Sequence, residues 1–257
     1  MGERFIRKTR FSLFCWNIAN PSLKRVEKQA GWLCNRPEDV LVLTETKKSQ
    51  GCLFLENYFK DNGYSVISSE STGEEFGVIV VSRHSLVPTN FAQTVNYLPS
   101  RVVSAKLAFQ GKELEIIGIY VPSRDRSVER IERKKRFLSD LSRALETKVQ
   151  LPFRILCGDF NILEPNHVPR YSFFRDWEYD FYRFLESCQL QDVFRFLHPI
   201  EQEYSWVGRT GNGYRYDHCF VSNELISLVS GCYYLHKPRE RKPRLSDHSA
   251  IITEFNL

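Results

Sequence analysis

The chain of 257 residues is 42% hydrophobic and contains 19 Phe, 12 Tyr and 4 Trp, which is enough for a substantial buried core. No apolar run approaches the roughly 20 residues of a membrane-spanning helix, so we expect no membrane partner. The net charge of +5 indicates little by itself, because many unrelated soluble proteins are equally basic.

The spacing of apolar residues predicts strands and helices that alternate along the chain. In chain order we predict a strand over residues 11–18, a helix over 21–35, a strand over 39–44, a helix over 51–62, strands over 64–69, 77–82, 102–109 and 113–121, a helix over 127–148, a strand over 153–157, a helix over 177–187, and strands over 215–222, 230–235 and 249–255. Gln110-Gly111 is predicted to form a hairpin turn. Hairpins and helical crossovers together favour an α/β (α+β) sandwich, with two packed mixed sheets flanked by helices.

No repeat, low-complexity block or linker divides the chain, so we expect residues 1–257 to form a single domain. Residues 1–9 are interpreted as a basic lead-in to the first strand, because the apolar stretch after them is too short for a signal peptide. The seven cysteines form no CxxC pair, and several lie within apolar runs. They predict reduced core thiols and an intracellular protein, cytoplasmic or, in a eukaryote, nuclear.

A Gly-Asp-Phe-Asn segment follows the strand predicted at 153–157. Asp159 and Asn161 stand two residues apart, so in extended geometry their side chains point the same way. A turn alone would explain this composition, because Gly, Asp and Asn all favour turns. It would not explain why polar side chains also end other apolar strands. We therefore predict that this segment carries chemistry.

Two further oxygen-bearing side chains, Asn17 and Glu45, end predicted strands nearer the N-terminus. A lone acid at a strand end can be an ordinary surface residue. A glutamate, an asparagine and a second acid nevertheless suit Mg²⁺, which takes oxygen ligands, better than zinc or copper. Asp247 is the natural second acid, so Glu45, Asn17 and Asp247 are predicted to bind a divalent metal.

His248 differs from the other five histidines because it follows both an acid and a basic run. A lone histidine is more often structural, but a carboxylate partner orients an imidazole and favours its charged form, which suits phosphate binding. Asp217, near the start of a predicted strand, is the candidate partner. Tyr120 could donate its hydroxyl to a phosphate oxygen or could pack in the core, and spacing does not separate these alternatives.

Basic residues gather directly before Asp247. The segment 237–244 contains a single acid against Lys237, Arg239, Arg241, Lys242 and Arg244. Positive potential beside the predicted chemistry favours a polyanionic substrate bound through its phosphates. Trp206 and Arg215 are also predicted to bind substrate, since a tryptophan near arginines suits stacking on a base or filling the gap at a missing base. Trp206 could equally pack in the core.

Six motifs, in this order and spacing, resemble the endonuclease/exonuclease/phosphatase superfamily. They are Trp-Asn at 16–17, Thr-Glu-Thr-Lys at 44–47, Tyr-Val-Pro at 120–122, Gly-Asp-Phe-Asn at 158–161, Arg-x-Asp at 215–217 and Ser-Asp-His at 246–248. The resemblance implies a four-layered α/β sandwich and phosphoester hydrolysis with Mg²⁺, or Mn²⁺ as a substitute, without a covalent intermediate. It implies that Glu45 is the principal metal ligand and that Asn17 and Asp247 complete the site directly or through water.

The same resemblance implies roles for the other motif residues. Asp159 resembles the residue that manages protons at the attacking water or the leaving oxygen. Asn161 and Tyr120 resemble groups that orient the phosphate. His248, held by Asp217, resembles the imidazole that binds or protonates the phosphate. Whether His248 or Asp159 activates the water stays open.

Within the superfamily, the segments 45–47, 191–195 and 204–206 most resemble the exonuclease III and abasic-site endonuclease branch. This implies a monomer that acts on duplex or nicked DNA. The chain departs from that branch at 17–21, where Asn-Ile-Ala-Asn-Pro replaces Asn-Gly-[Leu/Ile]-Arg, and at Thr44, where Gln is usual. A phosphodiesterase of the same fold, acting on a protein–DNA adduct, RNA, a nucleotide or an inositol or lipid phosphate, stays open. The intact acidic and imidazole set argues against a non-catalytic nucleic-acid-binding relative.

Overall fold

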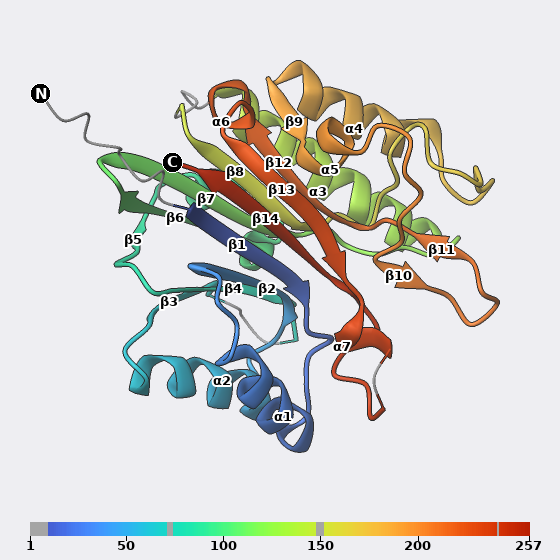
Figure 1. Ribbon diagram of the computed structural model, residues 1–257. Coiled ribbons are helices and arrows are strands. Elements are labelled where there is room, and N and C mark those ends of the chain that lie inside the picture. The colour runs from blue at the N-terminus through green and yellow to red at the C-terminus, as the bar shows by residue number, and fades with distance from the viewer. Residues whose placement is uncertain (1–9, 71–73, 148–151, 241) are drawn as a thin grey trace, which may run out of the picture.

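The computed structural model describes residues 10–70, 74–147, 152–240 and 242–257, whose arrangement is drawn in Figure 1. The basic lead-in 1–9 and Arg241 lie outside the described residues. In chain order the elements are β1 (Arg10–Asn17), α1 (Leu23–Leu33), β2 (Val40–Thr46), α2 (Gln50–Asp61), β3 (Ser65–Ser68), β4 (Gly77–Ser82), β5 (Val87–Pro88), β6 (Val102–Phe109), β7 (Lys112–Tyr120), α3 (Val128–Thr147), β8 (Arg154–Asp159), α4 (Asp176–Ser187), β9 (Leu190–Asp192), α5 (Val193–Leu197), β10 (Trp206–Val207), β11 (Gly213–Tyr214), β12 (Asp217–Ser222), α6 (Asn223–Ile226), β13 (Val229–Leu235), α7 (Lys237–Glu240) and β14 (Ala250–Asn256).

Two six-stranded mixed sheets form the centre of the fold. The strand order is β13-β14-β1-β2-β4-β3 in the first sheet and β5-β6-β7-β8-β12-β9 in the second. Each sheet has a parallel central pair, β1 with β2 and β7 with β8, and the remaining pairs are antiparallel. A parallel pair needs a crossover connection, which α1 and α3 provide. A short hairpin of β10 and β11 forms outside both sheets.

The sheets pack face to face, and helices cover their outer faces, so the fold has four layers (Figure 1). Phe11, Leu13 and Cys15 of β1 enter the core between the sheets, whereas Phe14 and Trp16 enter the core shared with α1 and α2. Because both faces of β1 are buried, its sequence is a continuous apolar run. The outer face of the second sheet packs under α3 and α4. The predicted four-layered sandwich is confirmed.

Every predicted strand and helix forms, with ends shifted by no more than two residues. Gln110 and Gly111 have φ values of 50° and 77°, as a two-residue hairpin turn requires. Several elements of two to five residues were not predicted from the sequence, namely β5, β9, α5, β10, β11, α6 and α7. Such elements are too short to carry a periodic signal, and contacts with distant parts of the chain decide them.

The buried thiols lie where apolar strands cross the core. Cys15, Cys52, Cys157, Cys219 and Cys232 are buried, and all but Cys52 lie between the two sheets. The prediction of core thiols is confirmed for these five. Within the described ranges, no helix is both long enough and apolar enough to cross a membrane.

Candidate active site

The polar ends of several strands meet at one edge of the two sheets. Tyr120 at the end of β7 lies in register with Asp159 of β8, and Asp159 lies in register with Asp217 of β12. A cleft of about 350 Å³ opens at this edge. It is lined by Glu45, Phe76, Tyr120, Ser123, Arg124, Lys134, Asp159, Asn161, Phe173, Phe174, Trp206, Tyr216 and His248. Residues far apart in sequence therefore share one pocket, as predicted.

Glu45 reaches the cleft because a β-bulge interrupts β2 at this point. The register with β4 shifts between Thr44 and Thr46, and Glu45 has a left-handed φ of 56°. A bulge re-aims a side chain out of the regular alternation, and bulges are common beside active sites. Asn17 Nδ2 donates to Glu45 Oε2 over 2.8 Å and so fixes the carboxylate in this direction.

Close packing and hydrogen bonds shape the Gly-Asp-Phe-Asn segment at the end of β8. A Cβ atom at Gly158 would lie 1.8 Å from the carbonyl oxygen of Ile119, so glycine is required there. The Asn161 backbone N–H donates to Asp159 Oδ1 over 2.9 Å, and its side-chain amide donates to the Val121 carbonyl over 3.0 Å. Gly158 and Asp159 are the last residues of β8, Phe160 and Asn161 follow it, and Asp159 and Asn161 both line the cleft.

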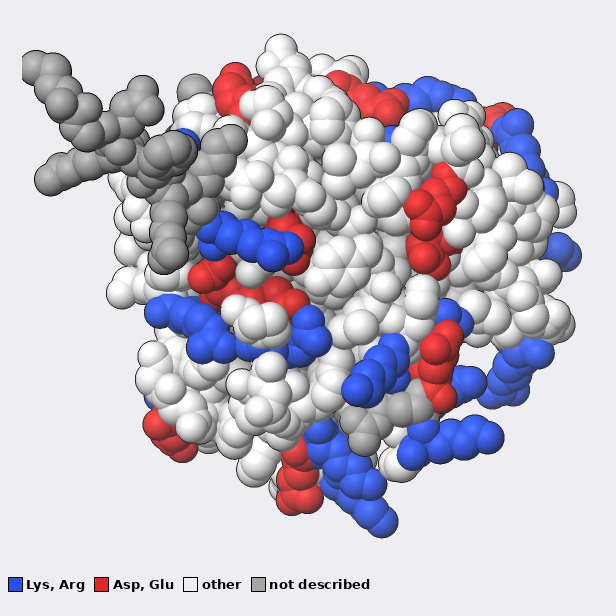
Figure 2. Space-filling view, viewed as in Figure 1, with Lys and Arg blue, Asp and Glu red and all other residues white. Residues whose placement is uncertain are grey.

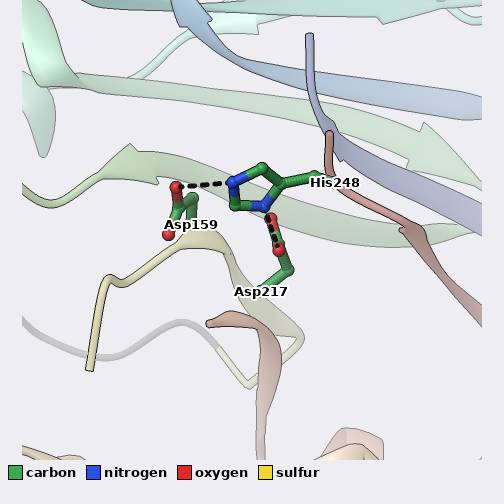
Figure 3. Close-up of side chains that lie close together, drawn as sticks. All are labelled: Asp159, Asp217 and His248. Atoms are coloured by element: carbon green, nitrogen blue, oxygen red, sulfur yellow. Dashed lines mark hydrogen bonds and ion pairs between the residues drawn. The ribbon is translucent and has the colours of Figure 1, made fainter. Parts of the chain in front are cut away.

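His248 lies between two buried aspartates, as Figure 3 shows. Its Nδ1 is 2.7 Å from Asp217 Oδ2, and its Nε2 is 4.0 Å from Asp159 Oδ2. Burial opposes the charged imidazole, but the charge and hydrogen bond of Asp217 outweigh it and raise the pKa of His248 to about 10. His248 is therefore a positively charged donor at neutral pH.

Asp159, the second aspartate beside His248, also has a shifted pKa. Burial, and then the negative charge of Asp217, raise the pKa of Asp159 to about 7, although His248 and the Asn17 hydrogen bond favour the ionised form. A carboxylate that titrates near neutral pH is well matched to accept and release a proton. The cleft thus places the protonated imidazole of His248 beside the Asp159 carboxylate, which can accept a proton.

Asp217→Asn is expected to return the pKa of His248 from about 10 towards its ordinary 6.5, because the largest favourable interaction of the imidazolium is removed. An NMR titration of the imidazole in metal-free protein measures this value directly. Because the pKa of His248 is raised by folding, its contribution to stability is complete below pH 6.5 and is lost as the pH rises through about 10. A His248 resonance in the wild type that titrates near 6.5 would contradict the prediction.

Oxygen donors suited to a divalent cation converge beside His248. Donor atoms of Asp159, Asp217 and His248 lie within 4.8 Å of one another, but a protonated imidazole offers no lone pair to a metal. A metal position beside Glu45 and Asp159 fits better than one among Asp159, Asp217 and His248. Asn17 Nδ2 is 2.8 Å from both Glu45 Oε2 and Asp159 Oδ2, so these two carboxylates flank the same amide group. Carboxylate oxygens are the donors that hard divalent cations take. The residues present fit a metal bound by Glu45 with Asp159 beside it.

Asn17 is predicted to complete the metal site directly or through water, and this role stays a prediction. Its Oδ1 accepts the backbone N–H of Ala19 over 2.9 Å, and its Nδ2 faces the two carboxylates. Asn17 therefore bridges Glu45 and Asp159. Asp247 is exposed, and its Oδ2 accepts a hydrogen bond from Trp206 Nε1 over 2.9 Å. Its role as a metal ligand stays a prediction.

Tyr120 combines both alternatives left open for it, since it is 5% exposed and also lines the cleft. Its hydroxyl is hydrogen-bonded to Glu45, and the guanidinium of Arg101 lies 4.6 Å from its ring centroid. Burial, and then the charge of Glu45, raise the pKa of Tyr120 well above its usual value. The hydroxyl therefore keeps its proton and can act as a donor.

One wall of the cleft is aromatic. Tyr214 and Tyr216 stack with ring centroids 5.2 Å apart, and Tyr171 stacks on Tyr214 at 4.6 Å. Trp206 is half-buried and packs against this stack with centroids 5.5 Å from Tyr214 and 6.0 Å from Tyr216. Trp206 thus belongs both to the packed wall and to the cleft surface. The sequence analysis did not identify the tyrosine stack, because its members come from separate loops and strands.

Arg215 does not bind substrate, which corrects the prediction. Its side chain is 0% exposed and forms ion pairs with Glu164 at 2.6 Å and Asp192 at 2.8 Å. Arg215 directly precedes the cleft residue Tyr216, but its guanidinium pairs with two buried acids and does not line the cleft. The guanidinium points to buried acids because they, rather than water, satisfy its donors.

Lys237, Lys242 and Arg244, which are predicted to bind substrate, are exposed. Figure 2 shows Lys and Arg side chains gathered over the region where Figure 1 places α7. Arg239 is half-buried and donates to Ser249 Oγ over 3.0 Å, so it holds the segment after His248 in place. Of the described basic residues in the segment 237–244, three are therefore exposed and Arg239 is half-buried.

The sequence analysis missed an ionic group behind Asn161. Lys134, Glu178 and Arg124 are almost fully buried, and Lys134 and Arg124 line the cleft. A signal was present, because Lys134 falls between Ile131 and Leu138 at the helical spacing of the apolar face. A lysine at an apolar position indicates either a break in the face or a buried pair.

The fold and the buried acid–imidazole arrangement define a hydrolase of phosphate esters. The chain belongs to the endonuclease/exonuclease/phosphatase family, whose family model matches residues 14–248. This confirms the resemblance drawn from the six motifs.

Solved structures share the fold over nearly the whole chain. An AP endonuclease from Archaeoglobus fulgidus is 24% identical with a TM-score of 0.81, and 96% of this chain and 100% of that chain are covered. The 3′-5′ exonuclease NExo from Neisseria meningitidis is 22% identical with a TM-score of 0.81 and the same coverage. The AP endonuclease LMAP from Leishmania major is 19% identical with a TM-score of 0.73, covering 96% of this chain and 88% of that chain.

Proposed function

We propose that this chain is a divalent-metal-dependent nuclease that hydrolyses phosphodiester bonds of DNA. The observation that carries the proposal is His248, with Asp217 at 2.7 Å and Asp159 at 4.0 Å, in a cleft that also contains Glu45. Attack of water on a phosphodiester requires a base for the water and positive charge for the phosphate oxygens. These side chains supply the base and part of the charge.

The chain's own residues divide the reaction between them. Asp159 accepts a proton from the attacking water as the water oxygen bonds to phosphorus, and returns it to the leaving sugar oxygen as the bond from phosphorus to that oxygen breaks. His248 stays protonated and donates from Nε2 to a non-bridging oxygen, while Asp217 holds the ring through Nδ1. Tyr120 offers a neutral hydroxyl donor. Mg²⁺, or Mn²⁺ in its place, bound by Glu45, would neutralise charge on the phosphate oxygens.

Three features support DNA as the substrate. Lys237, Lys242 and Arg244 place exposed positive charge before the site, which suits contacts to successive phosphates. Trp206 offers an aromatic surface at the cleft on which a base can stack. A 3′ phosphatase NExo from Neisseria with the same fold is described as bound to a product DNA hairpin.

A phosphodiesterase of the same fold on a smaller or different phosphoester is the second candidate. The departures from the abasic-site pattern at 17–21 and Thr44 favour it, because residues 18–21 directly follow β1 and Thr44 directly precedes the cleft residue Glu45 on β2. Both candidates use the same acid and imidazole groups, so the substrate alone separates them.

The test is a panel of labelled substrates with Mg²⁺: intact duplex DNA, nicked duplex, duplex with one abasic site, duplex with a 3′ phosphate, RNA and an inositol phosphate. We expect at least one DNA substrate to be cut and EDTA to abolish cutting, with recovery when Mg²⁺ or Mn²⁺ is restored. Turnover of the inositol phosphate alone would overturn the DNA proposal and leave the hydrolase class intact. Cutting that persists in EDTA would overturn the metal requirement.

A further inference from the structure

A buried lysine lies directly behind the catalytic segment. Lys134 projects from α3, its side chain is 1% exposed, and its Nζ donates to the Asn161 backbone carbonyl and to Glu178 Oε1, each over 2.6 Å. A buried ammonium is costly unless it is paired and its hydrogen bonds are made. One of its two bonds goes to the backbone of a residue that lines the cleft.

The counterion of Lys134 is itself held from several sides. Glu178 of α4 is 0% exposed, pairs with Arg124, and accepts the backbone N–H of Arg175 over 3.0 Å. Arg124 in turn donates to the Phe173 carbonyl over 2.6 Å and lies 4.2 Å from the centroid of the Phe173 ring. Lys134 therefore occupies a fixed position between α3, α4 and the end of β8.

Asn161 needs such a support because its backbone is left-handed, with φ of 49°. Non-glycine residues keep this conformation only where the surroundings determine it. Lys134 binds its carbonyl, and Asp159 Oδ1 accepts its N–H over 2.9 Å. The Lys134 ammonium thus binds the carbonyl of Asn161, and the Asp159 carboxylate binds its N–H. The direction of the Asp159 side chain therefore depends on Asn161 and, through it, on Lys134.

We propose that Lys134 is a positioning residue for the phosphoester reaction: it fixes the left-handed Asn161 so that the Asn161 N–H orients the Asp159 carboxylate. Lys134 acts through Asn161 and need not touch substrate, and Glu178 keeps the ammonium in place. The inference deepens the proposed function and rests on it, because the step it supports is the proton transfer at Asp159.

The experiment compares Lys134→Met, Asp159→Asn and the double variant in steady-state kinetics. We use the DNA substrate that the enzyme cuts and, in parallel, the chromogenic diester bis(p-nitrophenyl) phosphate. Lys134→Met is expected to lower kcat by about 10- to 100-fold, as losses of orienting contacts do, with KM changed less than about threefold. The double variant should match Asp159→Asn alone, because Lys134 acts only through the Asp159 carboxylate, which Asp159→Asn removes.

Lys106→Met is the matched control, since Lys106 is a partly exposed lysine of β6 paired with Glu113. It makes the same change in net charge and should leave kcat unchanged. Lys134→Arg, which keeps a charged donor, should recover most of the lost kcat. If Lys134→Met does not fold, Lys134→Gln takes its place in the cycle.

Effects of Lys134→Met and Asp159→Asn that multiply independently would overturn the proposal, as would a Lys134→Met enzyme with wild-type kcat. A purely structural lysine would lower the unfolding midpoint without the change in kcat at constant KM. If only the chromogenic diester is hydrolysed, the DNA proposal fails, while the cycle on that diester still decides the role of Lys134.

Discussion

Asp159→Asn is expected to lower kcat by about 10²- to 10⁴-fold, the range in which general acid–base groups contribute. The amide cannot accept the proton of the attacking water. The substitution keeps the size of the side chain, and its oxygen can still accept the Asn161 N–H that Asp159 Oδ1 now accepts. Single-turnover kinetics on the DNA substrate that the enzyme cuts measure the fall in the rate of the chemical step.

The same variant is expected to be more stable than the wild type at pH 8 without metal. The pKa of Asp159 is raised from 3.8 to about 7 by burial and by Asp217, so the cost to stability is absent below pH 3.8 and grows until the pH passes about 7. Removing the charge removes this cost, so thermal unfolding should show a gain that is largest at pH 8, smaller at pH 5 and absent below pH 3.8. Slow catalysis together with lower stability at pH 8 would indicate a damaged fold instead of a missing base.

His248→Ala tests whether His248 acts in the same chemical step as Asp159. It removes the cation that faces Asp159 at 4.0 Å, and its combination with Asp159→Asn should cost much less than the product of the single effects. Residues that act as one unit show this non-additivity. Fully multiplicative losses would separate His248 from the step at Asp159.

Arg215→Met is expected to lower the free energy of unfolding by about 3–5 kcal/mol, the cost of leaving buried charges without their partner. Arg215 donates through Nε and Nη2 to Glu164 over 3.1 and 2.6 Å, and through Nη1 and Nη2 to Asp192 over 3.3 and 2.8 Å. Asp192 also accepts the Tyr182 hydroxyl over 3.0 Å, so the network joins α4, β9 and the start of β12. Urea unfolding at pH 7 measures the loss.

The pH dependence of this loss of stability identifies the broken ion pairs as its cause. Burial opposes ionisation of Glu164, but Arg195 and Arg215 outweigh it and lower the pKa of Glu164 to about 2. This pairing stabilises the fold above pH 4.5, and the contribution is lost as the pH falls through about 2. The difference between wild type and Arg215→Met should therefore shrink in acid.

Arg209→Met is the control, because Arg209 is exposed at the turn between β10 and β11, where such a substitution should change stability by no more than about 0.5 kcal/mol. A substrate-binding role for Arg215 would instead give a folded protein of unchanged stability with weakened DNA binding. That outcome would overturn the interpretation of the buried network.

The amino-acid sequence by itself determined the layers of the fold and most of the site. In β1, Phe11, Leu13 and Cys15 alternate with Phe14 and Trp16, and such a run can satisfy both faces only inside a sandwich. Polar residues at the ends of these runs are too costly to bury without a function. Asp159, Asp217 and His248 were found for this reason, and the structure brings them together.

Only the tertiary structure decided where individual charged side chains point. Arg215 has no local feature that separates a solvent-facing cation from a buried one, and the apolar spacing around Lys134 fits either a break in the apolar face or a buried pair. Their direction depends on Glu164, Asp192 and Glu178, which lie 51, 23 and 44 residues away in the chain. Apolar burial follows a period that neighbouring residues share, whereas the free energy of a buried charge depends on one partner at one distance. That partner is set by how the layers pack, so it becomes visible only in three dimensions.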